Sequence, residues 1–374
     1  MNLNFRFAIV SDPHVALPHT IENSKSPFHL IEISIPALEL VFERLAQANA
    51  KIDFLLLTGD LTHHGEPDNH AWLASRLVRL PFPVYVIPGN HDIPVLKSNH
   101  QSIGWTEFGH YYQKSGYENP ESLYYTCEML PGVRLIALNS NIFDAQGNQL
   151  GRLDEAQLQW LEDVLIRANA HQELVLVMVH HNVVEHLPDQ SNHAMGRRYM
   201  LDNAGELRQL LARYGVQLVF TGHLHAQHIA CQQGLYDVTT GSLVSYPHPY
   251  RILEFRTDAR GRQTLQIASH RVESLPAWPD LPAKSRQLMA DRSYPFMMRL
   301  LSVPPLSLPQ PLCEEFAPFL RYFWADIACG DAWCDFPQFP PKVREYFQSF
   351  SSTNGNGQPM IKDNNITLEL HAPR

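Results

Sequence analysis

The sequence lacks the features of a membrane-spanning or exported protein. No apolar stretch in the chain approaches the roughly 20 residues that a helix needs to cross a bilayer. The segment Met1–Val10 carries no basic stretch followed by a long apolar one, so we expect no signal peptide. We therefore expect a cytoplasmic protein that does not have a membrane as a partner.

Cysteine is also scarce. The chain has five cysteines, an odd number, spread between Cys127 and Cys334. This usage favours reduced thiols in the cytosol over a disulfide framework. The spacing of Cys329 and Cys334, with no second pair nearby, is not typical of a zinc or redox site, and we expect buried thiols there.

Basic residues are fewer than acidic residues. The chain has 29 Lys and Arg against 38 Asp and Glu, a formal net charge of −9, and its basic residues form no long run. A non-specific grip on a nucleic-acid backbone needs a basic surface. We therefore expect a small substrate rather than a long nucleic acid. The sequence leaves open whether the chain forms a homo-oligomer.

The sequence does contain five short clusters of potential metal ligands, each at the end of an apolar run. They are Asp12-Pro13-His14, Gly59-Asp60, Gly89-Asn90-His91-Asp92, His180-His181 and Gly222-His223-Leu224-His225. The strand-like runs before them are Phe5–Val10, Phe54–Leu57, Val84–Ile87, Leu174–Val179 and Gln217–Phe220. Parallel strands end at a common edge of a sheet, and ligands bind at that edge. A lone Asp-Pro-His is usually a turn and a lone Gly-Asp is common, whereas the third and fifth clusters are much rarer. All five in order indicate a metal site.

The segments around the clusters predict the fold. Helix-like patterns alternate with the strands at Ile31–Asn49, at His70–Leu80, after Asp154 and at Ala204–Tyr214. Asp154 is expected to cap its helix with Gln157 reaching back, and Asn203 to cap the last one. Short alternating strands follow at Leu235–Thr240, Arg251–Arg256 and Gln263–His270. Two sheets face to face, each covered by helices, predict a four-layer α/β/β/α sandwich.

The composition changes near Leu275, which suggests a boundary. Prolines crowd Pro276–Pro282 and Pro304–Pro311, and aromatic residues crowd Phe316–Trp333. We expect a catalytic domain over residues 1–270, a mostly helical C-terminal extension over 271–350 and a flexible tail over 351–374. Within that tail, Ile366–Leu370 alternates in the manner of an edge strand.

The residue types in the clusters suit a pair of divalent cations. Asp60 follows a glycine that permits a sharp turn, and its carboxylate can bridge two ions. Oxygen and nitrogen ligands without thiolate favour Mn²⁺, Fe or Zn²⁺ over Ca²⁺. Two such ions, roughly 3.5–4 Å apart, stabilise the attacking and leaving oxygens in phosphoryl transfer. We therefore expect two divalent metal ions as cofactors.

Several neighbouring residues are candidates for direct contact with a substrate. His91 stands beside a ligand and can donate to phosphate oxygens or protonate a leaving group. Asp92 could orient it, although adjacent side chains seldom pair directly. His64 follows Asp60 on a loop. Further candidates lie between His181 and Asn203, where long loops are often functional and an arginine fork recognises phosphate: Arg197 and Arg198. For these loop residues, solvated surface positions are the alternative.

The five clusters resemble, in order, the signature of the calcineurin-like metallophosphoesterases. Within that superfamily the sequence is most similar to class III cyclic nucleotide phosphodiesterases and their bacterial relatives, over roughly residues 5–270. The resemblance implies one cation held by Asp12, His14, Asp60 and His225. It implies a second cation held by Asp60, Asn90, His180 and His223.

The fourth cluster departs from the family pattern. Relatives often continue it with proline, whereas Asn182 follows here, which puts the shape of the substrate-facing loop in question. Both His180 and His181 are possible ligands, and His180 is favoured because it lies at the end of the strand.

The resemblance and the ligand set predict a binuclear metal-dependent phosphoesterase. In-line attack by metal-bound hydroxide would hydrolyse a phosphodiester, with cyclic nucleotides one candidate, or a small phosphomonoester. The alternatives are a nuclease or phospholipid-headgroup hydrolase on the same core, and a non-catalytic scaffold that binds a partner through its C-terminal extension. The acidic charge counts against a nuclease, and the complete set of seven ligands counts against a scaffold.

Overall fold

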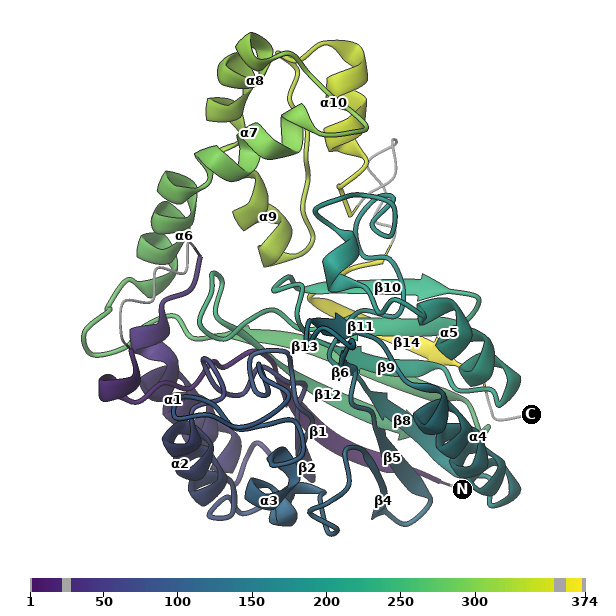
Figure 1. Cartoon of the computed structure of the whole chain (residues 1–374). Helices are drawn as coiled ribbons and strands as arrows, with labels where there is room; N and C mark the ends of the chain where they lie inside the picture. The colour runs from purple at the N-terminus through teal and green to yellow at the C-terminus, as the bar shows by residue number, and fades with distance from the viewer. Residues whose placement is uncertain (1, 22–27, 353–360, 372–374) are drawn as a thin grey trace.

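Two six-stranded sheets pack face to face in the computed structural model, which describes residues 2–21, 28–352 and 361–371 (Figure 1). The first sheet has the order β14-β13-β12-β1-β2-β3. Its strands are β1 (Asn4–Val10), β2 (Phe54–Leu57), β3 (Val84–Val86), β12 (Pro249–Thr257), β13 (Gln263–Arg271) and β14 (Asn365–Leu370). The neighbours β1, β2 and β3 run parallel, and the remaining pairs are antiparallel. Three parallel strands therefore end at one edge of this sheet.

The second sheet also mixes parallel and antiparallel strands and has the order β10-β11-β9-β8-β5-β4. Its strands are β4 (Tyr125–Leu130), β5 (Val133–Ala137), β8 (Leu174–Met178), β9 (Leu218–Thr221), β10 (His228–Gln232) and β11 (Leu235–Thr239). Strands β5, β8, β9 and β11 run parallel. A separate hairpin pairs β6 (Asn141–Phe143) with β7 (Gln149–Gly151).

Helices cover the outer face of each sheet, and the predicted four-layer sandwich is confirmed. The helices of this part are α1 (Ser34–Ala46), α2 (Pro67–Leu77), α3 (Phe108–Tyr111), α4 (Glu155–Ala170) and α5 (Ala204–Arg213). Short 3₁₀ turns lie at Pro18–Thr20, Ile31–Ile33, Gln113–Ser115, Arg197–Tyr199 and Ala317–Leu320. Apolar residues on one face of α4 and α5 pack with strands β5, β8 and β9 of the second sheet. The amphipathic spacing read from the sequence is what buries those faces.

Aromatic rings contribute to the mostly aliphatic core between the two sheets. Phe7 of β1 stacks on Phe54 of β2 with centroids 4.9 Å apart. The same Phe7 meets Phe220 of β9 edge-on at 5.6 Å, which joins the first sheet to the second. All three side chains are almost completely buried. Burial of each is worth about 1.5–3 kcal/mol, so these rings help to hold the two sheets together.

The C-terminal extension is helical, as expected, and has a core of its own. Its helices are α6 (Leu281–Arg292), α7 (Tyr294–Ser302), α8 (Gln310–Phe316), α9 (Phe323–Cys329) and α10 (Pro341–Gln348). Figure 1 shows them standing to one side of the sandwich. Their apolar cluster also takes in Leu224 and Ala226, which alternate with the ligand candidates of the fifth cluster. The extension therefore packs directly on the loop that carries His223 and His225, while its status as a separate domain stays a prediction.

Three local predictions were wrong or incomplete. Residues 365–370 of the expected flexible tail form β14, the edge strand that their alternation indicated; 353–360 and 372–374 lie outside the described residues. Asp154 does cap α4, but the Gln157 side chain pairs with the backbone of Asn139 instead of reaching back. Asn203 does lie at the N-cap position of α5, but its side chain makes no capping hydrogen bond and instead pairs with the backbone of Leu153. Both side-chain amides therefore hold the backbone of a loop in place.

No helix among the residues that the structure describes is long and apolar enough to pass through a bilayer.

Candidate metal centre

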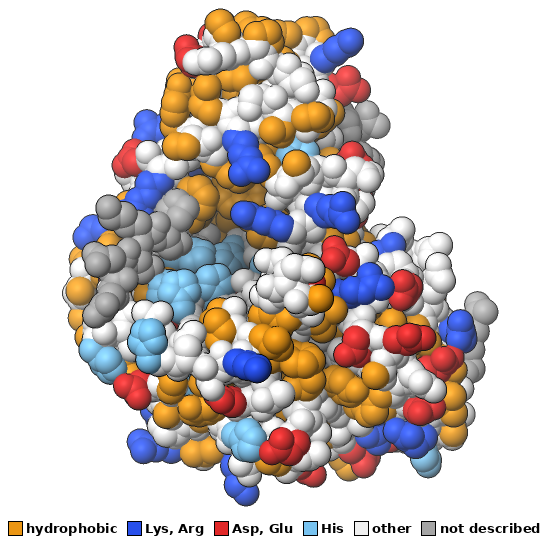
Figure 2. Space-filling view, viewed as in Figure 1, with side chains coloured by type: hydrophobic (Ala, Val, Ile, Leu, Met, Phe, Trp, Pro, Cys, Tyr) orange, Lys and Arg blue, Asp and Glu red, His pale blue; other side chains and the backbone are white. Residues whose placement is uncertain are grey.

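The predicted ligands come together where the carboxyl edges of the two sheets meet. Asp12, Asp60 and Asn90 follow β1, β2 and β3 of the first sheet, and His180 and His223 follow β8 and β9 of the second. Figure 2 shows a patch of histidine side chains in a hollow beneath the helical extension. Both sheets therefore contribute to the site, and the helical extension covers it.

The backbone at these positions is in an unusual conformation. Five of the seven predicted ligands have a positive φ: Asp12 at 48°, His14 at 41°, Asp60 at 49°, His223 at 65° and His225 at 58°. For residues other than glycine this conformation costs of order 1–3 kcal/mol each, and it persists where the surrounding structure demands it. Such strain concentrates at functional sites, which agrees with the predicted role of this edge.

Glycines let the ligand loops approach one another closely. A Cβ atom at Gly89 would lie 2.2 Å from Oδ1 of Asp60, and one at Gly59 would lie 2.5 Å from Nδ1 of His180. Gly59 also has a φ of 98°, which L side chains rarely adopt. The glycines of the Gly-Asp and Gly-Asn-His-Asp clusters are therefore required by contact between the loops.

Two groups of ligand atoms share Asp60. The first comprises Asp12, His14, Asp60 and His225, and the second comprises Asp60, His180 and His223; in each group the ligand atoms lie within 4.8 Å of one another. Nε2 of His225 lies 3.0 Å from Oδ1 of Asp12. Oδ2 of Asp60 lies 3.4 Å from Nε2 of His180 and 3.8 Å from Nε2 of His14. This placement supports Asp60 as the bridge, while the individual ligand roles stay predictions.

Hydrogen bonds turn one nitrogen of each histidine in the second group away from the centre. Nδ1–H of His180 donates to the Thr58 carbonyl at 2.8 Å, and Nε2–H of His223 donates to the Arg198 carbonyl at 3.2 Å. Nε2 of His180 and Nδ1 of His223 then keep their lone pairs. Histidines that bind metals are oriented in this way by an acceptor behind the ring.

Several polar atoms at the site fit a pair of cations because the described protein gives them no hydrogen-bond partner. They are both ring nitrogens of His14, Nε2 of His180 and Oδ1 of Asn90. A buried polar group without a partner costs about 1–3 kcal/mol. Nitrogen and oxygen donors directed at a carboxylate, without thiolate, suit Mn²⁺, Fe or Zn²⁺.

The electrostatics of the site favour neutral imidazoles around an ionised carboxylate. Burial and the nearby His91 keep the pKa of His14 well below its usual value. Burial works against the charge of Asp60, but His180 and His91 outweigh it and the pKa of Asp60 is lowered. His180 is the exception: burial lowers its pKa, yet the charge of Asp60 raises it to about 9.

His91 lies at the edge of the first group, and two hydrogen bonds hold it in place. Its backbone N–H donates to Oδ1 of Asp60 at 2.8 Å, and its Nδ1–H donates to the carbonyl of His63 at 2.7 Å. The ring stands perpendicular to that of His14, with centroids 4.8 Å apart. Nε2 is therefore the atom of His91 left for a substrate.

Asp92 does not orient His91. Its carboxylate accepts hydrogen bonds from the backbone N–H groups of Leu61, Thr62 and Gly89 at 2.8–3.0 Å, so it pins the loop after β2 to the loop after β3. Burial and the charge of Asp60 raise the pKa of Asp92 to about 7. The partner of His91 is a backbone carbonyl, and sequence gives no indication of such a contact.

The geometry favours His180 over His181 as the ligand of the fourth cluster. Nδ1 of His181 shares a hydrogen bond with Oγ of Ser140 at 2.8 Å, and His181 belongs to neither ligand group. The residue in place of the usual proline, Asn182, donates to Oγ1 of Thr221 at 3.0 Å. The two residues that follow donate their N–H groups to Asp237. A buried carboxylate therefore shapes this loop where relatives often use proline.

The proposed substrate contacts lie at different distances from the centre. The rings of His64 and His91 stack with centroids 5.4 Å apart. Arg198 lies over the Tyr199 ring, which in turn meets the ring of His223 at 5.2 Å. Arg197 instead lines a separate polar hollow with Arg208. The structure brings His64 and Arg198 to the rim of the site and places Arg197 elsewhere.

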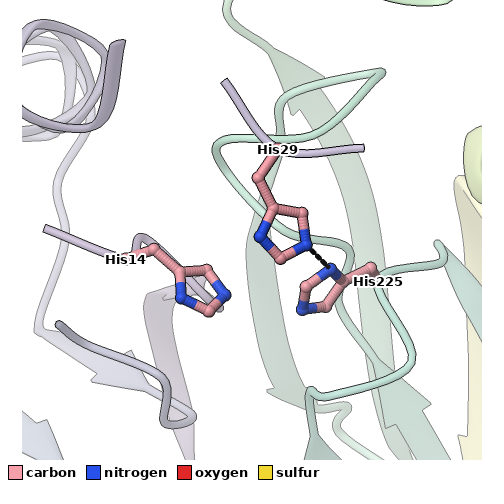
Figure 3. A group of neighbouring side chains, drawn as sticks. All are labelled: His14, His29 and His225. Carbon is pink, nitrogen blue, oxygen red and sulfur yellow. Dashed lines mark hydrogen bonds between the residues drawn. The ribbon is translucent and has the colours of Figure 1, made fainter. Parts of the chain in front are cut away.

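His29 belongs to the site but was missed in the sequence. It forms a third group with His14 and His225, and its Nε2 lies 3.0 Å from Nδ1 of His225 (Figure 3). As a lone histidine in a loop, distant in sequence from both partners, it belongs to no motif or spacing.

A comparison with protein families decides the family of this chain. The family model described as calcineurin-like phosphoesterase matches residues 5–227. The chain belongs to the calcineurin-like phosphoesterase family. The predicted phosphoesterase fold, hydrolase class and metal dependence are confirmed at the level of this family.

Similar curated phosphoesterases carry two kinds of name. The chain is 28% identical to a probable glycerophosphodiester phosphodiesterase of Arcobacter nitrofigilis, over 70% of this chain and 85% of the relative. It is 28% identical to a 3′,5′-cyclic-nucleotide phosphodiesterase of Nostoc, over 50% of this chain and 61% of the relative. It is 27% identical to a 3′,5′-cyclic adenosine monophosphate phosphodiesterase of Escherichia coli, over 50% of this chain and 60% of the relative.

A solved structure shows the same phosphoesterase fold. A dimetal phosphatase from Danio rerio superposes with a TM-score of 0.52 at 16% identity, covering 72% of this chain and 98% of that one.

Proposed function

We propose that this phosphoesterase is a binuclear metal-dependent phosphodiesterase that hydrolyses small phosphodiesters. The observation that carries the proposal is the pair of ligand groups that share Asp60, with unpartnered nitrogens of His14 and His180 beside it. His91 next to these groups supplies a group for acid catalysis.

In the proposed reaction, some residues around the centre bind the metal ions and His91 donates a proton. Asp12, His14, Asp60 and His225 would hold one cation, and Asp60, His180 and His223, with the unpartnered Oδ1 of Asn90, would hold the other. Divalent cations bound there neutralise phosphate charge and lower the pKa of water. Because Nδ1 of His91 is tied to the His63 carbonyl, Nε2 meets the phosphate and delivers its proton to the departing oxygen.

The proposed cofactors are two ions of Mn²⁺, Fe or Zn²⁺, because the donor set mixes imidazole, carboxylate and amide oxygen. The proposed location is the cytoplasm. It is supported by five free cysteines, among them Cys231 in an exposed position.

Small phosphodiesters are favoured by the relatives, and the helical extension lies beside the site. Relatives named for glycerophosphodiesters and for cyclic nucleotides share a small diester as the substrate. In this chain the helical extension presents Phe296 and Trp324 to an apolar pocket that Tyr199 also lines. Tyr199 contacts the ring of His223, so this pocket borders the proposed metal centre. We propose that residues 1–270 carry the chemistry, that 271–350 wall the substrate, and that His64 and Arg198 meet it at the rim.

A substrate panel tests this proposal. An aryl phosphomonoester, an aryl phosphodiester, 3′,5′- and 2′,3′-cyclic nucleotides, a glycerophosphodiester and single-stranded DNA would each be assayed with Mn²⁺, Fe²⁺ and Zn²⁺. We expect hydrolysis of at least one small diester, lost on chelation and restored by metal. Cleavage of DNA alone would identify a nuclease, and no turnover on any substrate would contradict the proposal.

A further inference from the structure

His225 differs from the other proposed metal-binding histidines in what stands behind its ring. His180 and His223 donate to backbone carbonyls, those of Thr58 and Arg198. Among the described residues, the hydrogen-bond partner of Nδ1 of His225 is the side chain of His29, at 3.0 Å (Figure 3). A contact to a side chain, unlike one to a backbone carbonyl, can be removed by substitution.

The direction of this hydrogen bond follows from the opposite side of the ring. Nε2 of His225 faces Oδ1 of Asp12 at 3.0 Å, within the first ligand group. For Nε2 to offer a lone pair to a cation, a neutral imidazole must carry its proton on Nδ1. That proton then points at Nε2 of His29, which accepts it. His29 therefore fixes both the tautomer and the plane of the His225 ring.

The chain holds His29 in place from both sides. The N–H of the following residue, Leu30, donates to the carbonyl of Val244 at 2.8 Å. The preceding residue, Phe28, meets Phe296 of α7 edge-on with centroids 6.1 Å apart. The helical extension and the loop after β11 therefore both position the segment from which His29 reaches the site.

We propose that His29 is a positioning residue for the first cation, acting through His225 rather than as a ligand. This inference rests on the proposed binuclear site. Loss of an acceptor behind a metal-binding histidine typically weakens metal affinity by about 10–100-fold. The effect should fall on the first cation, because His180 and His223 have acceptors of their own.

Four variants separate this role from others. His29→Leu removes the acceptor, whereas His29→Gln restores one, because a glutamine oxygen can accept where Nε2 did. His19→Leu and His19→Gln are the matched controls, since the His19 side chain is 63% exposed and pairs with Asp68. Metal-free protein would be titrated with Co²⁺, following bound metal by equilibrium dialysis and the ligand field by visible absorption.

We expect His29→Leu to bind one Co²⁺ with wild-type affinity and the other about 10–100-fold more weakly, with the wild-type spectrum at saturation. His29→Gln should recover most of the loss, and both His19 variants should match wild type. The normal affinity of the second ion shows that the variant is folded. Unchanged binding in His29→Leu would overturn the proposal, as would a changed spectrum at saturation, which would make His29 a ligand. A wild-type chain that binds no Co²⁺ would instead refute the proposed function.

Discussion

At the scale of single residues, three histidines of the site each have one ring nitrogen in a hydrogen bond and one that remains available. His180, His223 and His91 each engage one ring nitrogen with a backbone carbonyl behind the ring. The other nitrogen is left to face the shared centre around Asp60. Fixed orientation of this kind reduces the reorganisation needed when charge develops in a transition state.

Substitution of His91 tests its proposed role in acid catalysis. His91→Ala leaves both ligand groups in place, so two metal ions should still bind. Turnover of an aryl phosphodiester should fall by about 10²–10⁴-fold, the usual contribution of a positioned proton donor. Metal content and kcat would be measured on the same preparation, with His19→Ala as the exposed control. A wild-type kcat in His91→Ala would remove the catalytic role.

At the scale of elements, the ligands at the strand ends could be predicted from the sequence. The side-chain contacts that hold the surrounding loops could not. Asp12, Asp60 and His180 follow apolar strands, and the order of parallel strands then places them together, so local sequence was enough. The contacts of His29, Asp92 and Gln157 join segments that lie far apart in the chain, and no local pattern encodes them. Asn203 shows the same limit, because helix-capping propensity predicted a contact that pairing with Leu153 replaced.

The close approach of two loops makes Gly89 a sensitive position. In Gly89→Ala the new methyl group would collide with Asp60. We expect loss of metal and of activity, with destabilisation of about 1–3 kcal/mol. Gly205→Ala is the control, because its Cβ would lie 3.9 Å from the nearest neighbour and within α5. Circular dichroism and metal analysis of both variants would check this; full metal content in Gly89→Ala would disprove the steric argument.

At the scale of the whole molecule, the carboxylate of Asp363 joins the tail to two other parts. It accepts from the N–H of Ile229 in β10 at 3.1 Å, from the N–H of Asp331 at 2.7 Å and from Oγ of Ser352 at 2.8 Å. The side chain is fully buried. This network ties the second sheet and the helical extension to the segment that leads into β14.

Removal of that carboxylate should destabilise the fold without touching the site. Asp363→Ala leaves buried donors unpaired, and each costs about 1–3 kcal/mol. We expect a clear loss in the free energy of unfolding while activity per folded molecule is retained. Glu369→Ala, exposed on β14, should change stability by no more than about 0.5 kcal/mol. Equal stabilities of the two variants in urea would contradict this account.

Buried histidines also make stability depend on pH. His70, between the Tyr112 hydroxyl and the Asp92 carbonyl, has its pKa lowered by burial to about 3. In the unfolded chain its pKa is about 6.5. Between these values the unfolded state binds a proton that the folded state does not, so the stability present above pH 6.5 is lost as the pH falls.

The contribution of this one imidazole can be isolated. In chelator, His70→Gln should lose about 2 kcal/mol less stability between pH 7 and pH 5 than the parent chain. Urea unfolding at the two pH values would measure the difference. An identical loss in both proteins would show that His70 does not remain neutral in the folded state.

Metal stoichiometry tests most directly the claim that Asp60 joins two cation sites. Metal-free protein would be loaded with Mn²⁺, dialysed and analysed for bound metal, alongside Asp60→Asn and Asp68→Asn, whose native carboxylate is 72% exposed. We expect two ions in the wild type and in Asp68→Asn, and weakened binding of both ions in Asp60→Asn. Two tightly held ions in Asp60→Asn, or none in the wild type, would contradict that claim.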